Sequence, residues 1–191
     1  MSKPVRVIIM ATKKPKVLIS SARIQQRVKE LAKEISRDYQ DKDLVLIGIL
    51  KGAFVFLADL ARNITIPLAL DFIQVSSYGA TKASTGVIKI KKDIDLPIVN
   101  KDVLIVEDII DFGYTLDYLR RFISHKKARS VHICALLDKP ARHRVDLKVD
   151  YLGFTVPDRF LVGYGIDYAE RYRNLPYIGY LEFDDEKPRQ S

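Results

Sequence analysis

Apolar residues follow two patterns along the chain, one with helical spacing and one with short continuous runs. The first helical pattern starts after Ser20 or Ser21, either of which is placed to cap a helix. Its apolar positions recur every three or four residues, as on the buried face of a helix. They are Ile24, Val28, Leu31, Ala32 and Ile35.

The continuous runs have the length of strands and lie at 44–49, 69–75, 103–106, 131–137 and 151–156. Branched aliphatic residues dominate the first of them, as expected of a strand that is buried on both faces. Helical patterns follow at about 53–62 and over 116–123. Strands that alternate with helices predict an α/β fold, with a mainly parallel central sheet flanked by helices. The first dozen residues alternate apolar and basic groups, which favours a short edge strand.

Length and composition predict one domain over residues 1–191, since 191 residues with 48% hydrophobic content can bury a sizeable core. Residues 76–87 are polar, small and glycine-containing. A long loop in a compact domain is often a mobile active-site lid, although a solvated hairpin tip has the same composition. Residues 184–191 are charged, and we expect this tail to fray.

The chain carries no sign of secretion or membrane insertion. No apolar run approaches the roughly 20 residues that cross a bilayer, and the first residues lack the pattern of a signal peptide. The single cysteine, Cys134, lies in an apolar run, where a buried and unreactive thiol is expected. We therefore predict a cytoplasmic protein with no membrane partner.

The formal net charge of +8 leaves two classes of partner open. A basic surface attracts nucleic acid, but it also serves an enzyme whose substrate carries several phosphates. The basic residues are scattered, with modest clusters at 13–16, 89–92 and 120–129. Charge alone does not decide between the two classes.

The stretch 103–115 carries the clearest chemistry. Glu107 and Asp108 follow a buried run, and Asp111 and Gly113 precede a helix. Ligands of parallel α/β sheets bind outside the carboxyl ends of the strands. A glycine turn with a helix N-terminus suits a phosphate, and adjacent carboxylates suit sugar hydroxyls. Acids that only cap a helix and flank a turn are the simpler alternative.

This stretch resembles the signature with which type I phosphoribosyltransferases bind phosphoribosyl diphosphate (PRPP). Its sequence Val-Glu-Asp-Ile-Ile-Asp is similar to that of the hypoxanthine-guanine branch. Four further segments resemble that branch in the same order, so the similarity spans about residues 44–179. They are the diphosphate loop 50–52, the lid motifs 76–79 and 84–86, the purine-lysine segment 136–140, and the purine and metal segment 157–168 with Arg173.

The resemblance implies an enzyme that transfers phosphoribosyl from PRPP to hypoxanthine or guanine with Mg²⁺, has a small purine-binding hood subdomain, and forms a homodimer or homotetramer. Asp111 would be the catalytic acid or base, and Glu107, Asp108 and Asp167 would hold the metal. The implied substrate-binding residues are Lys51, Gly52, Ser77, Tyr78, Glu107, Asp108, Ile109, Ile110, Asp111, Phe112, Gly113, Tyr114, Thr115, Lys139, Phe160, Leu161, Asp167 and Arg173.

Among the individual roles that the resemblance implies, Lys51 and Arg173 would bind diphosphate, and residues 111–115 would cradle the 5′-phosphate. Lys139 would donate to the exocyclic oxygen of a 6-oxopurine, which only accepts hydrogen bonds. Phe160 would stack on the base, although a core phenylalanine is the alternative, and Leu161 would offer backbone groups. A cis peptide is expected between Leu50 and Lys51.

One position departs from the family pattern. Phe112 replaces a hydroxyl residue that commonly contacts the phosphate, and such a bond to a charged group contributes about 1.5–3 kcal/mol. This departure keeps a rival function open, a PRPP-sensing regulator that binds nucleic acid. Four residues argue against the rival, because a sensor has no need of a purine pocket. They are Asp111, Lys139, Phe160 and Asp167. We therefore expect no nucleic-acid partner.

Overall fold

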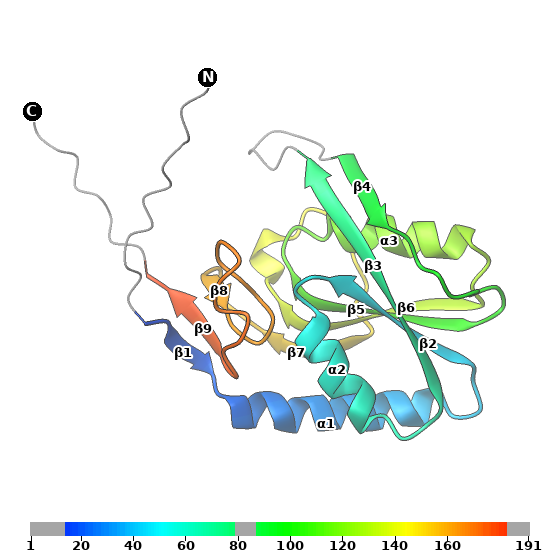
Figure 1. Ribbon diagram of the computed structural model, residues 1–191, viewed down its shortest axis with the longest axis horizontal. Helices are drawn as coiled ribbons and strands as arrows, with labels where there is room; N and C mark the ends of the chain where they lie inside the picture. Colours follow the sequence, from blue (N-terminus) through cyan, green and yellow to red (C-terminus); the bar gives the residue numbers. More distant parts are fainter. Residues whose placement is uncertain (1–13, 79–86, 183–191) are drawn as a thin grey trace, which may run out of the picture.

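The computed structural model describes residues 14–78 and 87–182. Six strands form the central sheet in the order β4-β3-β2-β5-β6-β7 (Figure 1). All neighbouring strands are parallel except β3 and β4, which confirms the predicted α/β class. The strands are β2 (Leu44–Leu50), β3 (Leu68–Tyr78), β4 (Val87–Lys92), β5 (Asp102–Ile110), β6 (Ser130–Asp138) and β7 (Tyr151–Thr155).

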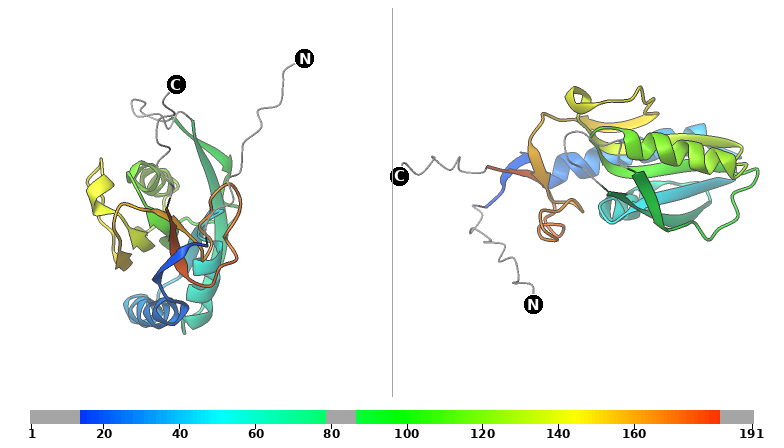
Figure 2. Two further views of the ribbon diagram at one scale, coloured as in Figure 1. Left: turned by 90° about the vertical axis from the view of Figure 1, so that its left-hand side faces the viewer. Right: turned by 90° about the horizontal axis from the view of Figure 1, so that it is seen from above.

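Helices cover both faces of this sheet, so its central strands are buried on both sides (Figure 2). Helices α1 (Ser21–Asp38) and α2 (Phe54–Asn63) pack on one face with Leu44 and Leu46 of β2. Helix α3 (Tyr114–His125) packs on the other face with Val45 and Ile47. Successive side chains of β2 therefore point alternately into two hydrophobic cores, one on each face of the sheet. This explains why its apolar run is continuous. Ser20 caps α1, as predicted.

A second, three-stranded antiparallel sheet lies at one end of the molecule, beside the start of α1 (Figure 1). Its strands lie in the order β1 (Lys16–Ile19), β9 (Ile178–Leu181) and β8 (Phe160–Val162). We call this sheet the hood. Its strands are only three or four residues long, which is why no hydrophobic pattern marked them. The edge strand expected in the first dozen residues lies outside the described residues.

Two boundaries differ from the predicted ones. Strand β5 runs on to Ile110, so Glu107 and Asp108 lie within the strand and not after it. The predicted loop 76–87 was too long, because Ser76–Tyr78 ends β3, Val87 begins β4, and the two strands pair antiparallel. The ends of this segment therefore form a hairpin. Residues 79–86 and the tail 184–191 lie outside the described residues, and the lid and its mobility stay a prediction.

The fold also bears on the predictions for the single cysteine and for membrane insertion. Cys134 is fully buried in β6, and burial raises the pKa of its thiol, as expected of an unreactive cysteine. Within the described residues, no helix is both long enough and apolar enough to cross a bilayer.

Candidate active site

The order of the strands places three loops side by side. In the sheet, β3 is the neighbour of β2 on one side and β5 is its neighbour on the other. The direction in which successive strands are added therefore reverses beside β2. Ile110 and Asp138 are register partners at the ends of β5 and β6. Asp111 and Lys139 therefore begin neighbouring loops at the edge of the sheet where α/β proteins bind ligands.

A cavity of about 240 Å³ opens at this edge, between the strand ends and the hood. It brings together predicted residues from three separate segments, namely Ile109, Asp111, Lys139, Phe160, Leu161 and Asp167. Four other lining residues were not predicted, and they are Arg142, Asp158, Arg159 and Ile166. Three of these lie inside the segment 157–168, so their place beside predicted residues could have identified them. Nothing in the sequence pointed to Arg142.

The carboxylate of Asp111 lies among cations. Arg142 Nε is 3.1 Å from Asp111 Oδ1, and Lys139 Nζ is 3.7 Å from the same oxygen. Despite these contacts, Asp111 Oδ1 is buried and accepts no hydrogen bond. A buried acceptor with its hydrogen bond unmade is placed to interact with a bound partner.

Two further contacts fix the direction of Arg142. Its guanidinium donates to Asp158 Oδ1 at 3.2 Å, and its central carbon lies 4.6 Å from the centre of the Phe112 ring. An arginine over an aromatic face is a favourable cation–π contact. Phe112, which departs from the family pattern, therefore holds an arginine that contacts Asp111.

The loop before α3 has the geometry of an anion site. Gly113 adopts φ 85°, and a Cβ there would lie 2.7 Å from Val145 Cγ2, so glycine is required on two grounds. Gly113 is also the N-cap of α3, and no side chain caps this helix. The N–H groups of the first turn, which includes Tyr114 and Thr115, are therefore available to an anion, as at many phosphate sites.

The adjacent acids Glu107 and Asp108 of β5 lie next to the loop that follows β2. Glu107 and Asp108 are both buried, and burial raises the pKa of each, with the neighbouring Asp108 carboxyl raising that of Glu107 further. A Cβ on Gly52 would lie 1.8 Å from Asp108 Oδ2. Only glycine allows the 51–53 turn to pass this close to the carboxyl group.

The remaining predicted residues differ in how they face the site. Ile110 is buried in the core beneath α3, so it could offer only backbone groups to a ligand. Phe160 is 45% exposed, which contradicts the alternative of a core phenylalanine, and it forms an edge contact with Tyr168. Ser77 and Tyr78 lie at the end of β3.

A second cluster lies beside the cavity, where the turn after β2 meets the loop between β8 and β9. The Leu50–Lys51 peptide is cis, as predicted. Arg173 donates to the Gly165 carbonyl at 2.8 Å and pairs with Asp167 at 2.9 Å. Glu170, which was not predicted, forms salt bridges with both Lys51 and Arg173. Both predicted diphosphate-binding cations therefore meet at one carboxylate.

The donors predicted for Mg²⁺ fit a hard cation only in part. In 14–78 and 87–182, no three acidic, histidine or cysteine side chains are grouped closely enough to hold a metal ion by themselves. Glu107, Asp108 and Asp167 are nevertheless oxygen donors, and neither Glu107 nor Asp108 has a salt-bridge partner in the described part of the chain. Mg²⁺ commonly takes one or two carboxylates and completes its shell with phosphate and water oxygens. Such a mixed shell suits this set.

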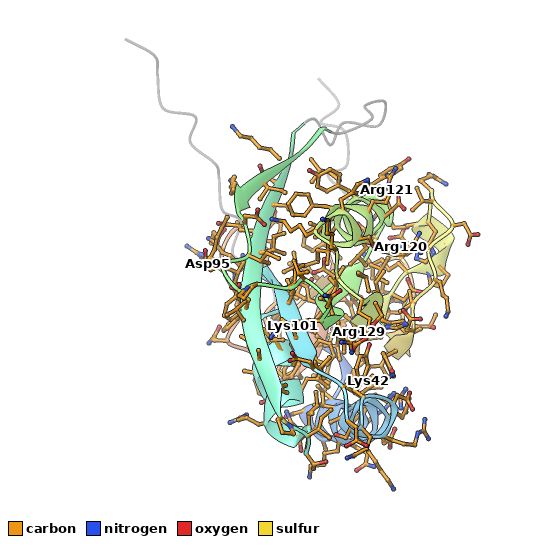
Figure 3. All side chains as sticks on the ribbon, turned by 90° about the vertical axis from the view of Figure 1, so that its right-hand side faces the viewer. Lys42, Asp95, Lys101, Arg120, Arg121 and Arg129 are labelled. Atoms are coloured by element: carbon orange, nitrogen blue, oxygen red, sulfur yellow. The ribbon has the colours of Figure 1, made fainter. Side chains whose placement is uncertain are left out.

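Basic side chains also gather at the opposite end of the molecule, away from the hood (Figure 3). Acids accompany most of those labelled in the figure. Arg120 and Arg121 pair with Asp117, and Arg129 pairs with the buried Asp102. Paired charges of this kind provide little net attraction for a polyanion, so this surface gives no support to a nucleic-acid regulator.

Comparisons with known proteins agree with this geometry. The model of the phosphoribosyl transferase domain matches residues 19–169. The hypoxanthine-guanine phosphoribosyltransferase of Bacillus subtilis (strain 168) is 54% identical over 167 residues, which cover 87% of this chain and 93% of the relative. The hypoxanthine phosphoribosyltransferase of Escherichia coli (strain K12) is 49% identical and covers 89% and 97%. A solved hypoxanthine phosphoribosyltransferase from Staphylococcus aureus superposes with a TM-score of 0.85 at 47% identity, covering 90% of this chain and 92% of that chain.

Proposed function

The chain belongs to the phosphoribosyl transferase domain family, and we propose that it transfers the phosphoribosyl group of PRPP to hypoxanthine or guanine. The products are the purine nucleotide and diphosphate. It is an enzyme of purine salvage, as its relatives at about 50% identity indicate. One observation carries the residue roles, namely that Asp111, Lys139 and Phe160 line a single cavity beside the uncapped N-terminus of α3.

The cavity suits a flat base with an exocyclic oxygen. The half-exposed ring of Phe160 offers a stacking face. The ammonium of Lys139 donates to the purine oxygen, whereas the amino group of adenine would meet it as a second donor. Asp111 takes the proton from the purine ring as the ring nitrogen attacks the anomeric carbon. The nitrogen–carbon bond forms while the bond from that carbon to diphosphate breaks.

The phosphates and the ribose bind around this cavity. The first-turn N–H groups of α3 receive the 5′-phosphate, and Glu107 and Asp108 accept hydrogen bonds from the ribose hydroxyls. Lys51 and Arg173 take the charge of the leaving diphosphate. Glu107, Asp108 and Asp167 would hold Mg²⁺, which would help to neutralise that charge.

Three further predictions from the sequence complete the proposal. The segment 76–87, with Ser77 and Tyr78, closes over the site and excludes water that would otherwise hydrolyse the developing sugar cation. The enzyme acts in the cytoplasm and assembles as a homodimer or homotetramer.

Replacement of Asp111 by Asn tests the proposal directly. Loss of a general base lowers kcat by about 10²- to 10⁴-fold, while the KM for PRPP stays within a few-fold because the first-turn N–H groups of α3 that receive the phosphate are unchanged. Asp146→Asn is the matched control, since this exposed aspartate does not line the cavity. A wild-type protein that gives no nucleotide from hypoxanthine, PRPP and Mg²⁺, but binds RNA in a salt-sensitive manner, would overturn the transferase in favour of the regulator.

A further inference from the structure

Glu170 places its carboxylate between the two cations that the proposed function assigns to diphosphate. Its Oε2 atom lies 3.1 Å from Lys51 Nζ and 3.2 Å from the Arg173 guanidinium. The two cations come from the turn after β2 and from the loop before β9, which are far apart in the sequence. One carboxylate oxygen therefore bridges both sides of the diphosphate site.

The carboxylate can leave this position at little cost. Its side chain is 65% exposed, so it can turn into water without unpacking a core. The local backbone is held by a separate bond, in which Glu170 N donates to Asp167 Oδ2 at 2.8 Å. Hydrogen bonds from Lys51 and Arg173 lower the pKa of Glu170, so the carboxyl is charged at neutral pH.

The two cations differ in how firmly they are held. The Arg173 side chain is 20% exposed. It also donates to the Gly165 carbonyl and forms a salt bridge with Asp167, so it keeps its direction without Glu170. The Lys51 side chain is 55% exposed, and in the described part of the chain Glu170 is its salt-bridge partner. The carboxylate therefore does little to place Arg173 and mainly neutralises the pair.

We propose that Glu170 is an affinity-setting residue that occupies the diphosphate site as an internal anion. This inference rests on the proposed function, because it takes Lys51 and Arg173 as ligands of diphosphate. A diphosphate group, in PRPP or as the free product, must displace the carboxylate to reach both cations. Glu170 thus weakens the binding of substrate and product alike and speeds the release of diphosphate after transfer.

Glu170→Gln removes the charge and keeps the size of the side chain. An exposed ion pair contributes so little that loss of the competitor tightens binding by only about two- to fivefold. The dissociation constant of inorganic diphosphate, measured by calorimetry in the presence of Mg²⁺, should fall by this factor at low salt. The difference should shrink as added salt screens the carboxylate. Glu170→Ala should behave in the same way.

Glu182→Gln is the matched control. Glu182 also forms an exposed salt bridge with a lysine, Lys16, at 2.7 Å, but this pair lies at the far edge of the hood. Its substitution should leave diphosphate binding unchanged. Lys51→Met should reduce the effect of Glu170→Gln, because one of the two cations for which the anions compete is then missing.

The sign of the change decides the question. Tighter diphosphate binding supports the proposal. Unchanged binding in folded Glu170→Gln overturns it, and weaker binding does so as well, since Glu170 would then organise Lys51 and Arg173 for the ligand. Absence of diphosphate binding in the wild type would overturn it too. A wild type that binds diphosphate but forms no nucleotide would defeat the transferase proposal alone, because calorimetry does not depend on turnover.

Discussion

Arg142 Nε lies 3.1 Å from Oδ1 of Asp111, and no sequence motif had placed Arg142 in this cavity. The same guanidinium stacks on Phe112 and bonds to Asp158, so its position is fixed from three sides. The proposed catalytic carboxylate therefore depends on a residue of the short helix η1 (Pro140–Arg142), which follows β6.

Replacement of Arg142 by Gln should lower kcat with hypoxanthine by about tenfold, since a contact to a charged group contributes about 1.5–3 kcal/mol. The KM for PRPP should change little. Arg142→Lys should restore only part of the rate, because an ammonium cannot contact Asp111, Asp158 and the Phe112 ring together. Steady-state kinetics check both variants, and Arg37→Gln, an exposed residue paired with Asp38, is the control. Full activity of Arg142→Gln would contradict the role.

Replacement of Phe112 by Ser should have two opposite effects. The added hydroxyl can bond to the 5′-phosphate, so the KM for PRPP should fall by up to about tenfold. Loss of the ring frees Arg142, so kcat should fall. Phe112→Leu separates the effects, because it removes the ring and adds no hydroxyl. A KM for PRPP that falls equally in both variants would rule out the hydroxyl as the cause.

Lys139→Met should remove the donor for the purine oxygen. The Lys139 side chain is 7% exposed and lies 3.8 Å from Asp158, so a methionine of similar length can fill its space. We expect kcat/KM for hypoxanthine to fall by about 10- to 100-fold, the value of a hydrogen bond to a charged group. Lys148→Met, at an exposed lysine paired with Asp150, is the control. A rate unchanged with hypoxanthine would mean that another group reads the oxygen.

The buried carboxylate of Asp59 should control stability in a pH-dependent way. Asp59 lies in α2 and accepts hydrogen bonds from Tyr164, in the loop after β8, and from Gln25 of α1. These bonds connect that loop to α1 and α2. Burial raises the pKa of Asp59, but these bonds and that from Arg62 outweigh burial and lower it below 3.8. The stabilisation is therefore present above pH 3.8 and is lost as the pH falls through the lower, folded value.

Asp59→Asn should accordingly lower the melting temperature near neutral pH by several degrees, from a loss of about 1–3 kcal/mol. The gap in melting temperature to the wild type should narrow as the pH falls from 3.8 through the lower pKa of folded Asp59, since the folded wild type then loses the charge as well. Thermal unfolding followed by circular dichroism, from neutral pH to below pH 3.8, measures how the difference in melting temperature changes with pH. Tyr164→Phe should show part of the loss, and a gap that widens in acid would contradict the assignment.

Local pattern was enough for much of the fold. The continuous run of β2 required two covered faces, and Ser20 with the repeat after it defined α1. The order of motifs, from the turn at Lys51 to Asp167, was enough to name the family. The strands β8 and β9 escaped prediction because three or four residues in a hood carry no readable period.

The sequence by itself determined the class of fold, the family and the residues directly around each motif, because these depend on local spacing and on short-range order. Only the tertiary structure decided that Arg142 contacts Asp111 and that Glu170 bridges Lys51 and Arg173. Lys51 and Glu170 are 119 positions apart, and they meet because parallel strands end at one edge of the sheet while the hood loop folds back over it. Contacts of that kind depend on how separate elements pack, which no local pattern of residues encodes.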